Sequence, residues 1–356
     1  MSWWADNDDL DEPYGEFDES AVRVRPNPKG NRPRTKIRPE HGDALNATVL
    51  GVDRGRFSVL IGSEGKTRTA IATRARELGK KAIVTGDRVR LVGDTSGDEG
   101  TLARIVSVDD RTTLLRRSAD DTDTVERVIV ANADQMLIVI AAANPEPRTR
   151  LVDRYLVAAY DAKIRPLICV TKTDLADPAA FLRSFEGLGI TTFTSEPNHT
   201  PLAEIADHLV GHETVFVGHS GVGKSTLINA LVPGAERAIG RVNEVTGRGR
   251  HTSSSTVRLR LDTPRGTGWV IDTPGVRSFG LGHVNPESIV RAFTDLAAIA
   301  LECPRGCTHR EDAPDCAVAQ AVTEGRLGET GATRLDSLHR LLETFSARAG
   351  TERPGR

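Results

Sequence analysis

The segment from Gly218 to Ser225, which reads GHSGVGKS, has the residue types and spacing of a phosphate-binding loop. Its glycines let the backbone turn N–H groups toward phosphate oxygens, while Lys224 would supply charge to the β and γ phosphates and Ser225 would ligate Mg²⁺. A Gly-rich turn can match by chance, but this segment follows an apolar strand and opens an amphipathic helix, which is the context that the motif requires. The residues assigned to phosphate binding are Gly218, His219, Ser220, Gly221, Val222, Gly223, Lys224, Ser225 and Thr226.

Two segments after this loop could complete a nucleotide site. Asp272 ends an apolar run and could hold Mg²⁺ through water, and the N–H of Gly275 could bond the γ phosphate. Between them and the loop lies the Gly/Arg/Ser/Thr stretch 247–256, where Thr252 could join the Mg²⁺ shell when the γ phosphate is present. Each segment alone also fits an ordinary turn or loop, but their order and spacing after the phosphate loop support each other.

A candidate base-reading motif, TKTD, lies upstream of the phosphate loop, and we assign all four residues, Thr171, Lys172, Thr173 and Asp174, to the nucleotide. The Asp174 carboxylate can accept hydrogen bonds from the N1–H and the N2 amino group of guanine, whereas adenine offers neither donor pattern. Lys172 would lie along the phosphate loop and the ribose. Thr194 and Ser195, after the next strand, could supply backbone over the base oxygen.

The elements that must position these residues alternate between strands and helices. We expect apolar strands at 135–143, 166–171, 190–195, 214–218 and 269–273, and helices at 148–162 and 224–232. Near-continuous apolar strands alternating with helices predict a parallel sheet that is covered on both faces. Every candidate motif follows the carboxyl end of a strand, where open α/β sheets bind ligands. The anomaly is the chain order, because a Ras-like GTPase has its base-reading motif after the phosphate loop.

A second group of reactive side chains lies near the C-terminus: Cys303, Cys307, His309 and Cys316. Three thiolates and one imidazole make a closed tetrahedral set for one structural Zn²⁺. The alternative is three unrelated reduced cysteines. Cys169 lies in an apolar run and is expected to be a buried core residue.

Composition sets the limits for the rest of the chain. With 356 residues, two or three domains are expected. Residues 43–116 read as five short strands, which predicts a small barrel of the oligonucleotide-binding (OB) type, with an SH3-like barrel as the alternative. Phe57 is the only aromatic residue there, so base stacking would be limited and contact with folded RNA through Arg and Lys is favoured.

The N-terminal segment is strongly polarised in charge. The net charge is −2, yet residues 1–20 contribute eight acidic residues and no basic ones, so the remainder carries +6. Seven basic residues follow within 23–38, in a segment that we expect to be disordered and to act either as a solvated linker or as an arm for nucleic-acid phosphates. The apolar runs are too short to cross a bilayer and no signal-peptide pattern opens the chain, so we expect a cytoplasmic monomer with no membrane partner.

Taken together, residues 42–345 resemble the circularly permuted GTPases, and closely the ribosome small-subunit-dependent GTPase A family. The resemblance rests on NADQMLIVIAA, RLVDRYLVAA, TKTDL, GHSGVGKSTLINAL, GRGRHTS, IDTPGVRSFGL and the Cys/His group. It implies an OB-type barrel, a permuted α/β P-loop GTPase domain and a C-terminal helical zinc-binding domain. It also implies GTP hydrolysis stimulated by the small (30S) ribosomal subunit, a role in late maturation of that subunit, and contact with its 16S rRNA.

On this basis we divide the chain into five parts. They are an extension (1–41), the barrel (42–118), the permuted GTPase domain (119–282), the zinc-binding domain (283–346) and a polar tail (347–356).

Several positions depart from the family pattern or bear on the mechanism. The family usually has Asn at the place of Thr171, so nucleotide affinity is expected to be lower while Asp174 keeps the choice of guanine. The first switch reads HTS at 251–253 where HTT is usual, and the gaps between the zinc ligands differ by one residue. Val276 follows Gly275 where Ras-type enzymes have a water-orienting Gln, which predicts slow intrinsic turnover.

The residues expected to act in catalysis are Lys224, Thr252 and His251, the last as the group that positions water. The alternative for His251 is a loop histidine with no role in the chemistry. Two competing functions are an RNA-binding checkpoint protein that uses GTP as a docking switch, and a P-loop ATPase acting on another nucleic acid. Asp174 argues against the ATPase.

Overall fold

The computed structural model describes residues 42–62, 66–79, 82–118, 126–197, 199–235, 256–274, 279, 281 and 284–346. All the described residues belong to one unit of the chain, within His41–Arg356. The expectations for the charged N-terminal extension and for the polar tail therefore lie outside the described residues. Among the described residues, no helix combines the length and apolar character needed to span a membrane.

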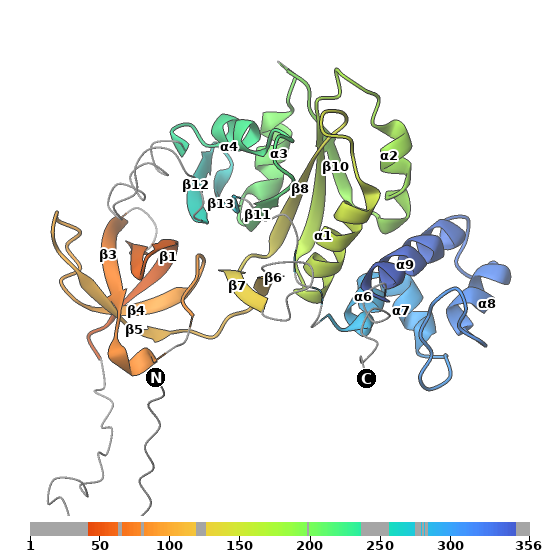
Figure 1. The fold of residues 1–356 in the computed structure, drawn as a ribbon, viewed down its shortest axis with the longest axis horizontal. Helices are drawn as coiled ribbons and strands as arrows, with labels where there is room; N and C mark the ends of the chain where they lie inside the picture. The colour runs from red at the N-terminus through yellow and green to blue at the C-terminus, as the bar shows by residue number, and fades with distance from the viewer. Residues whose placement is uncertain are drawn as a thin grey trace, which may run out of the picture. The chain divides into compact units, whose positions relative to one another are not determined.

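The first five strands form a closed barrel (Figure 1). They are β1 (Leu45–Asp53), β2 (Arg56–Ile61), β3 (Arg68–Arg74), β4 (Arg88–Gly93) and β5 (Ala103–Val108), with the 3₁₀ turn η2 (Arg76–Leu78) after β3. Alternate side chains point inward, and Val49, Val59, Leu91 and Ile105 form a core with no exposed surface. The strands pair in the order β1-β2-β3-β5-β4, and a β1–β4 pairing closes the circle, which confirms the OB-type barrel.

The central sheet is parallel apart from one edge. It contains β8 (Gln135–Ala141), β9 (Arg165–Thr171), β10 (Thr191–Thr194), β11 (Glu213–Val217), β12 (Val257–Thr263) and β13 (Gly266–Asp272). Their order is β10-β9-β8-β11-β13-β12, and only β12 runs antiparallel, against β13. The five strands predicted from the apolar runs are confirmed.

Helices cover both faces of this sheet (Figure 1). They are α1 (Thr149–Asp161), α2 (Ala179–Arg183), α3 (Leu202–Leu209) and α4 (Lys224–Leu231), with the 3₁₀ turn η3 (Glu186–Leu188) before β10. Strand β8 shows why both faces are needed, because Met136 and Ile138 join one hydrophobic core with α1, while Leu137 and Val139 join the other with α3 and α4. A strand without a polar face is stable only between two layers of helices.

A short hairpin between the barrel and the central sheet was not predicted. It consists of β6 (Leu114–Ser118) and β7 (Glu126–Ala131). Leu115 of β6 is buried in the same core as α1. The side chain of Asn132, just after β7, donates to the Gly86 carbonyl at 2.9 Å and accepts from the Thr112 N–H at 2.9 Å. These bonds hold the hairpin against the barrel loop at Gly86. The proposed boundary at 118/119 remains a prediction.

The C-terminal part is helical, as expected. It contains α6 (Pro286–Ala292), α7 (Thr294–Ala300), α8 (Ala317–Thr323) and α9 (Gly331–Ser346). Helix α6 begins where Asn285 caps the Glu287 N–H at 3.0 Å and Pro286 occupies the first turn. Leu338, Leu341 and Leu342 of α9 are buried in the core that includes α1.

Candidate nucleotide site and metal centre

The parallel strands bring the predicted motifs to one edge of the sheet. Strands β9, β11 and β13 end at Thr171, Val217 and Asp272, and their pairing with β8 in between is parallel throughout. Because the carboxyl ends of parallel strands share an edge, the base-reading motif, the phosphate loop and Asp272 adjoin one another although up to 101 residues separate them (171 to 272).

The phosphate loop lies close to the strands beneath it. A Cβ on Gly218 would come within 2.4 Å of the Val139 carbonyl oxygen of β8, so a side chain there cannot fit without moving backbone. Gly223, at φ 92°, is the N-cap of α4. Val222 is buried beneath the loop, whereas His219, Ser220, Ser225 and Thr226 are exposed at its surface. The loop therefore has a fixed base and an accessible rim.

Lys224, at the start of α4, forms an ion pair with Asp272 at the end of β13. Both side chains are about nine-tenths buried, with 10% and 8% of their surfaces exposed. The next residue, Thr273, donates its hydroxyl to the Phe216 carbonyl of β11 at 2.7 Å. The two charged groups predicted to meet phosphate and Mg²⁺ are thus neighbours. The hydrogen bond of Thr273 holds the residue after β13 against β11.

The base-reading motif and the following loop are joined by backbone bonds. The Thr173 N–H donates to the Ser195 carbonyl at 3.3 Å, and the Ser195 N–H donates to the Val170 carbonyl at 2.8 Å. Asp174 is exposed beside them. The structure therefore places the Ser195 loop next to Asp174, as a pocket for a base requires.

Lys172 has a partner that the sequence analysis did not single out. Its ammonium donates to the Asn144 carbonyl, in the loop between β8 and α1. The signal available in the sequence was an Asn-Pro pair directly after the apolar run of β8.

Thr171 lies under the phosphate loop. Its side chain is almost fully buried, and its hydroxyl oxygen is 2.5 Å from the Val222 carbonyl oxygen and 3.1 Å from the Ile140 carbonyl oxygen. Other predicted site residues, namely His251, Thr252 and Gly275, lie outside the described residues. Their roles toward water, Mg²⁺ and the γ phosphate stay predictions.

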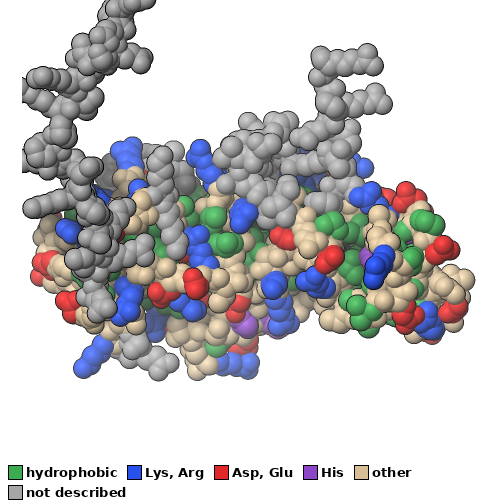
Figure 2. Space-filling view, turned by 90° about the horizontal axis from the view of Figure 1, so that it is seen from below, with side chains coloured by type: hydrophobic (Ala, Val, Ile, Leu, Met, Phe, Trp, Pro, Cys, Tyr) green, Lys and Arg blue, Asp and Glu red, His purple; other side chains and the backbone are tan. Residues whose placement is uncertain are grey.

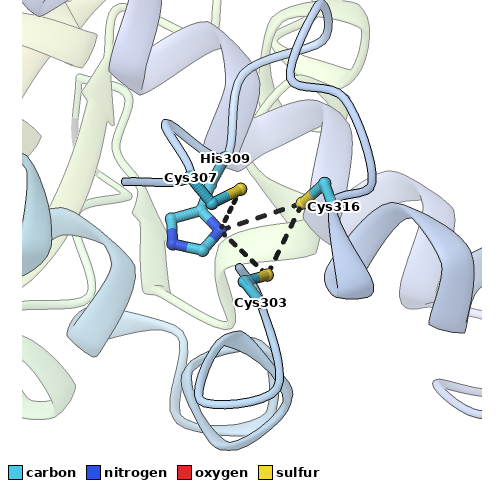
Figure 3. Close-up of side chains that lie close together, drawn as sticks. All are labelled: Cys303, Cys307, His309 and Cys316. Carbon is cyan, nitrogen blue, oxygen red and sulfur yellow. Dashed lines mark hydrogen bonds between the residues drawn. The ribbon is translucent and has the colours of Figure 1, made fainter. Parts of the chain in front are cut away.

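The four metal-ligand candidates converge on one point (Figure 3). The Nδ1 atom of His309 lies 3.6 Å from the sulfurs of Cys303 and Cys307 and 3.8 Å from that of Cys316. The sulfurs of Cys303 and Cys316 are 4.0 Å apart, and all four ligand atoms lie within 4.8 Å of one another. The separations are close to those of a tetrahedral ion with bonds of about 2.3 Å to sulfur and about 2.0 Å to nitrogen, which places the ligands about 3.5–3.8 Å apart.

The surroundings of this group also suit a metal ion. The Ala317 N–H, at the start of α8, donates to the Cys303 sulfur at 3.3 Å, a bond that favours the thiolate. Burial lowers the pKa of His309, which keeps its imidazole in the neutral form that ligates metals. Burial, followed by the neighbouring thiols, raises the pKa of Cys307 to about 11, so a metal ion would have to displace a proton there. The group can hold one metal ion with no ligand position left open.

Comparison with known proteins agrees with this geometry. Residues 108–282 match the model of the RsgA GTPase family. A relative from Pseudomonas aeruginosa (strain LESB58), named small ribosomal subunit biogenesis GTPase RsgA, is 38% identical over 254 residues, which cover 69% of this chain and 72% of the relative. A relative of the same name from Pseudomonas fluorescens (strain SBW25) is 36% identical over 307 residues, covering 83% and 86% of the two chains.

Two solved structures have the same fold. YjeQ from Thermotoga maritima superposes with a TM-score of 0.61 at 24% identity, over 86% of this chain and 99% of that one. YloQ, described as a circularly permuted GTPase, superposes with a TM-score of 0.60 at 25% identity, over 89% and 99%. The early position of the base-reading motif is therefore a property of a permuted fold. From its sequence similarity along most of its length and from its strand order, the chain belongs to the RsgA GTPase family.

Proposed function

We propose that this protein is a GTPase that binds the small (30S) ribosomal subunit and assists its late maturation, hydrolysing GTP to GDP and phosphate under stimulation by the subunit. The observation that carries the proposal is the convergence of Asp174, the phosphate loop and Asp272 at one sheet edge in a chain whose relatives are named small ribosomal subunit biogenesis GTPases. Its alternatives are a checkpoint protein that uses GTP only to control docking, and an ATPase.

The proposed roles in the nucleotide site follow from position and chemistry. Asp174 reads guanine, with Thr171, Lys172 and Thr173 beside it, and the loop from Gly218 to Thr226 holds the phosphates. Lys224 neutralises the β and γ phosphates as charge develops there. Mg²⁺ would be held by Ser225 and Thr252 directly and by Asp272 through water, with the Gly275 N–H on the γ phosphate. His251 is proposed to position the attacking water.

The metal proposed for the Cys303, Cys307, His309 and Cys316 group is one structural Zn²⁺. Thiolate ligands favour soft or borderline ions, and a tetrahedral set of three sulfurs and one nitrogen is typical of zinc. Its contribution here is to hold the segment between α7 and α8 in place.

The partner surface is proposed on the barrel. Eight arginines between the start of β1 and the end of β5 are exposed, and charge of this sign attracts the phosphates of 16S rRNA; they are Arg54, Arg56, Arg68, Arg74, Arg76, Arg88, Arg90 and Arg104. Figure 2 shows Lys and Arg side chains spread across one face of the molecule, with Asp and Glu between them. The five-part division given above, a monomeric state and action in the cytoplasm complete the proposal.

The deciding experiment measures the GTPase rate of the full chain alone, with purified small subunits, and with purified large subunits. Stimulation by small subunits only is expected. Binding to small subunits that requires a GTP analogue, without any stimulation of hydrolysis, would replace the proposal by the checkpoint function. Hydrolysis of ATP in competition with GTP would favour the ATPase.

A further inference from the structure

We infer that Thr171, although it stands first in the base-reading motif, acts on the phosphate side of the site: it orients the phosphate loop and makes no contact with the base. This inference rests on the proposed function of the site as a guanine-nucleotide site. Thr171 also departs from the Asn that is usual in the family at this position.

The Thr171 hydroxyl lies between two backbone carbonyl groups. A threonine hydroxyl has a single proton to donate. The Thr171 oxygen lies 2.5 Å from the Val222 carbonyl oxygen and 3.1 Å from the Ile140 carbonyl oxygen, and both acceptors belong to the backbone. The shorter contact goes to the phosphate loop. Donation to a guanine acceptor would require the hydroxyl to leave both carbonyls, in a residue with only 6% of its surface exposed.

The peptide bond between Val222 and Gly223 determines where the Gly223 N–H points. In a trans peptide the C=O and the N–H point to opposite sides of the chain. Among the described residues the only cis bond is Asn144–Pro145, so the bond between Val222 and Gly223 is trans. Because the Val222 carbonyl faces Thr171, the Gly223 N–H faces away from it. That is the side on which a phosphate loop presents its N–H groups to the ligand.

The Thr171 side chain also packs against the phosphate loop. A Cβ added to Gly223 would lie 3.5–3.7 Å from the Thr171 side chain, which is ordinary van der Waals contact. The branched side chain thus fills the space directly below the last turn of the loop, before Lys224 begins α4. Thr171 is therefore a positioning residue for the loop, and its hydroxyl and its methyl group both serve that role.

The consequence for specificity can be stated in terms of guanine. Guanine presents N7 and O6 as acceptors on one edge. An amide side chain at this position has two N–H donors, so it could bond both the loop and that edge, whereas the hydroxyl of Thr171 serves only the loop. We therefore expect the affinity of this protein for a guanine nucleotide not to depend on N7. Asp174 is expected to select guanine.

The test compares the affinity for GDP with that for 7-deaza-GDP, in which a C–H replaces N7, in four full-length proteins: the wild type, Thr171→Val, Thr171→Ser and Thr214→Val. Thr214→Val is the matched control. Thr214 is also fully buried in the sheet with one hydroxyl bond, to Gln135 at 2.8 Å, but it lies at the opposite end of β11 from the loop.

Thr171→Val should lower the affinity for both nucleotides by the same factor, about threefold to tenfold, which corresponds to one lost hydrogen bond. Thr171→Ser should restore most of the affinity, and Thr214→Val should lower the melting temperature without changing affinity. A ratio of the two affinities that differs between the wild type and Thr171→Val would overturn the inference, because Thr171 would then contact the base. Unchanged affinity in Thr171→Val would overturn it as well. A wild type that binds neither nucleotide would overturn both the inference and the proposed function.

Discussion

At the scale of single residues, Lys224 and Asp272 form an ion pair with each other, although both are proposed to act on the nucleotide and its Mg²⁺. The Asp272 carboxylate holds the ammonium that should contact phosphate, and it would itself repel phosphate in the absence of Mg²⁺. The same carboxylate should help to bind Mg²⁺. Its contribution to nucleotide affinity therefore depends on whether the cation is present.

We accordingly predict opposite effects of Asp272→Asn under two conditions. Without Mg²⁺, GDP affinity should rise by roughly threefold to tenfold, because Lys224 loses a charged hydrogen-bond partner and becomes available to phosphate. With Mg²⁺, GTP hydrolysis should fall by about tenfold or more. Titration of a fluorescent GDP with and without a chelator checks the first effect. Glu213→Gln, which removes the partner of Arg258 at the other end of the sheet, is the control and should change neither.

The candidate motifs could be recognised from sequence because each combines particular residue types at a fixed spacing, although the roles of their residues toward the nucleotide stay predictions. The contacts between motifs could not be recognised in this way. Lys172 meets Asn144 from a loop 28 residues away, and Thr171 meets Val222 at a distance of 51 residues in the chain. No local pattern encodes such a pair, since each depends on which strand ends become neighbours. For the same reason Thr171 could be identified from sequence as a departure from the family pattern, whereas the direction in which its hydroxyl points could not be predicted.

At the scale of elements, strand β8 lies directly beneath the phosphate loop and leaves no room for a side chain at Gly218. We predict that Gly218→Ala lowers the affinity for GDP and for GTP by at least about tenfold, because the added Cβ would meet the Val139 carbonyl at 2.4 Å and push the loop off the sheet. Gly234→Ala is the control: Gly234 also has a positive φ, of 88°, but no atom lies within 4 Å of its added Cβ. Equal loss of affinity in both variants would contradict the prediction.

Three of the strands predicted from sequence have side chains that are buried along nearly their whole length. The apolar runs of β8, β9 and β11 indicated strands covered on both faces. Strand β12, which reads VRLRLDT, was missed because charges alternate along it. One of those charges, Arg258, is nevertheless buried, and its guanidinium lies 3.4 Å from the centre of the Trp269 ring while it pairs with Glu213. These partners come from β13 and β11, so only the tertiary structure explains the strand.

The metal centre gives a prediction for the helices that flank it. Cys307→Ser should abolish stoichiometric zinc and destabilise the C-terminal helices by several kcal/mol, on the order of 5, because ligand binding and folding are coupled at such sites. Elemental analysis and thermal melting, each with and without a chelator, check this. Cys169→Ala, which changes a cysteine buried in the central sheet, should keep its zinc and lose stability only through the cavity it leaves. Full zinc content in Cys307→Ser would contradict the assignment of this ligand.

At the scale of the whole molecule, an ion pair joins the last helix, α9, to helix α1, which packs on the central sheet. Asp153 of α1 has no exposed surface, and both of its carboxylate oxygens lie 3.1 Å from the Nε of Arg340 on α9. Arg340 also lies over the Phe185 ring at 5.2 Å. Near the start of the same helix, Arg334 donates to the Gly187 carbonyl at 3.0 Å and pairs with Asp295 at 2.6 Å. The C-terminal helices thus share one core with α1.

The stability that the contact between Asp153 and Arg340 provides should depend on pH through the pKa of Asp153. Burial raises this pKa to about 6, from 3.8, although the charge and hydrogen bonds of Arg340 act in the opposite direction. The folded protein therefore holds the proton more strongly than the unfolded chain does. The contribution of Asp153 to stability is greatest below about pH 4 and is lost as the pH rises to about 6, by up to roughly 3 kcal/mol.

Measuring the free energy of unfolding of the wild type and of Asp153→Asn between pH 4 and pH 7 tests this prediction. The difference, wild type minus variant, should decrease as the pH rises through this range and level off above about pH 6.5. Asp295→Asn provides the opposite case: partial burial alone would raise the pKa of Asp295, but hydrogen bonds, first among them that of Arg334, lower it overall. Its contribution should therefore stay constant between pH 4 and pH 7 and be lost only on further acidification, below about pH 4. If the difference in unfolding free energy between the wild type and Asp153→Asn increased with pH, the Arg340 charge would outweigh burial. The contact between Asp153 and Arg340 would then be an ion pair that strengthens as the carboxyl ionises.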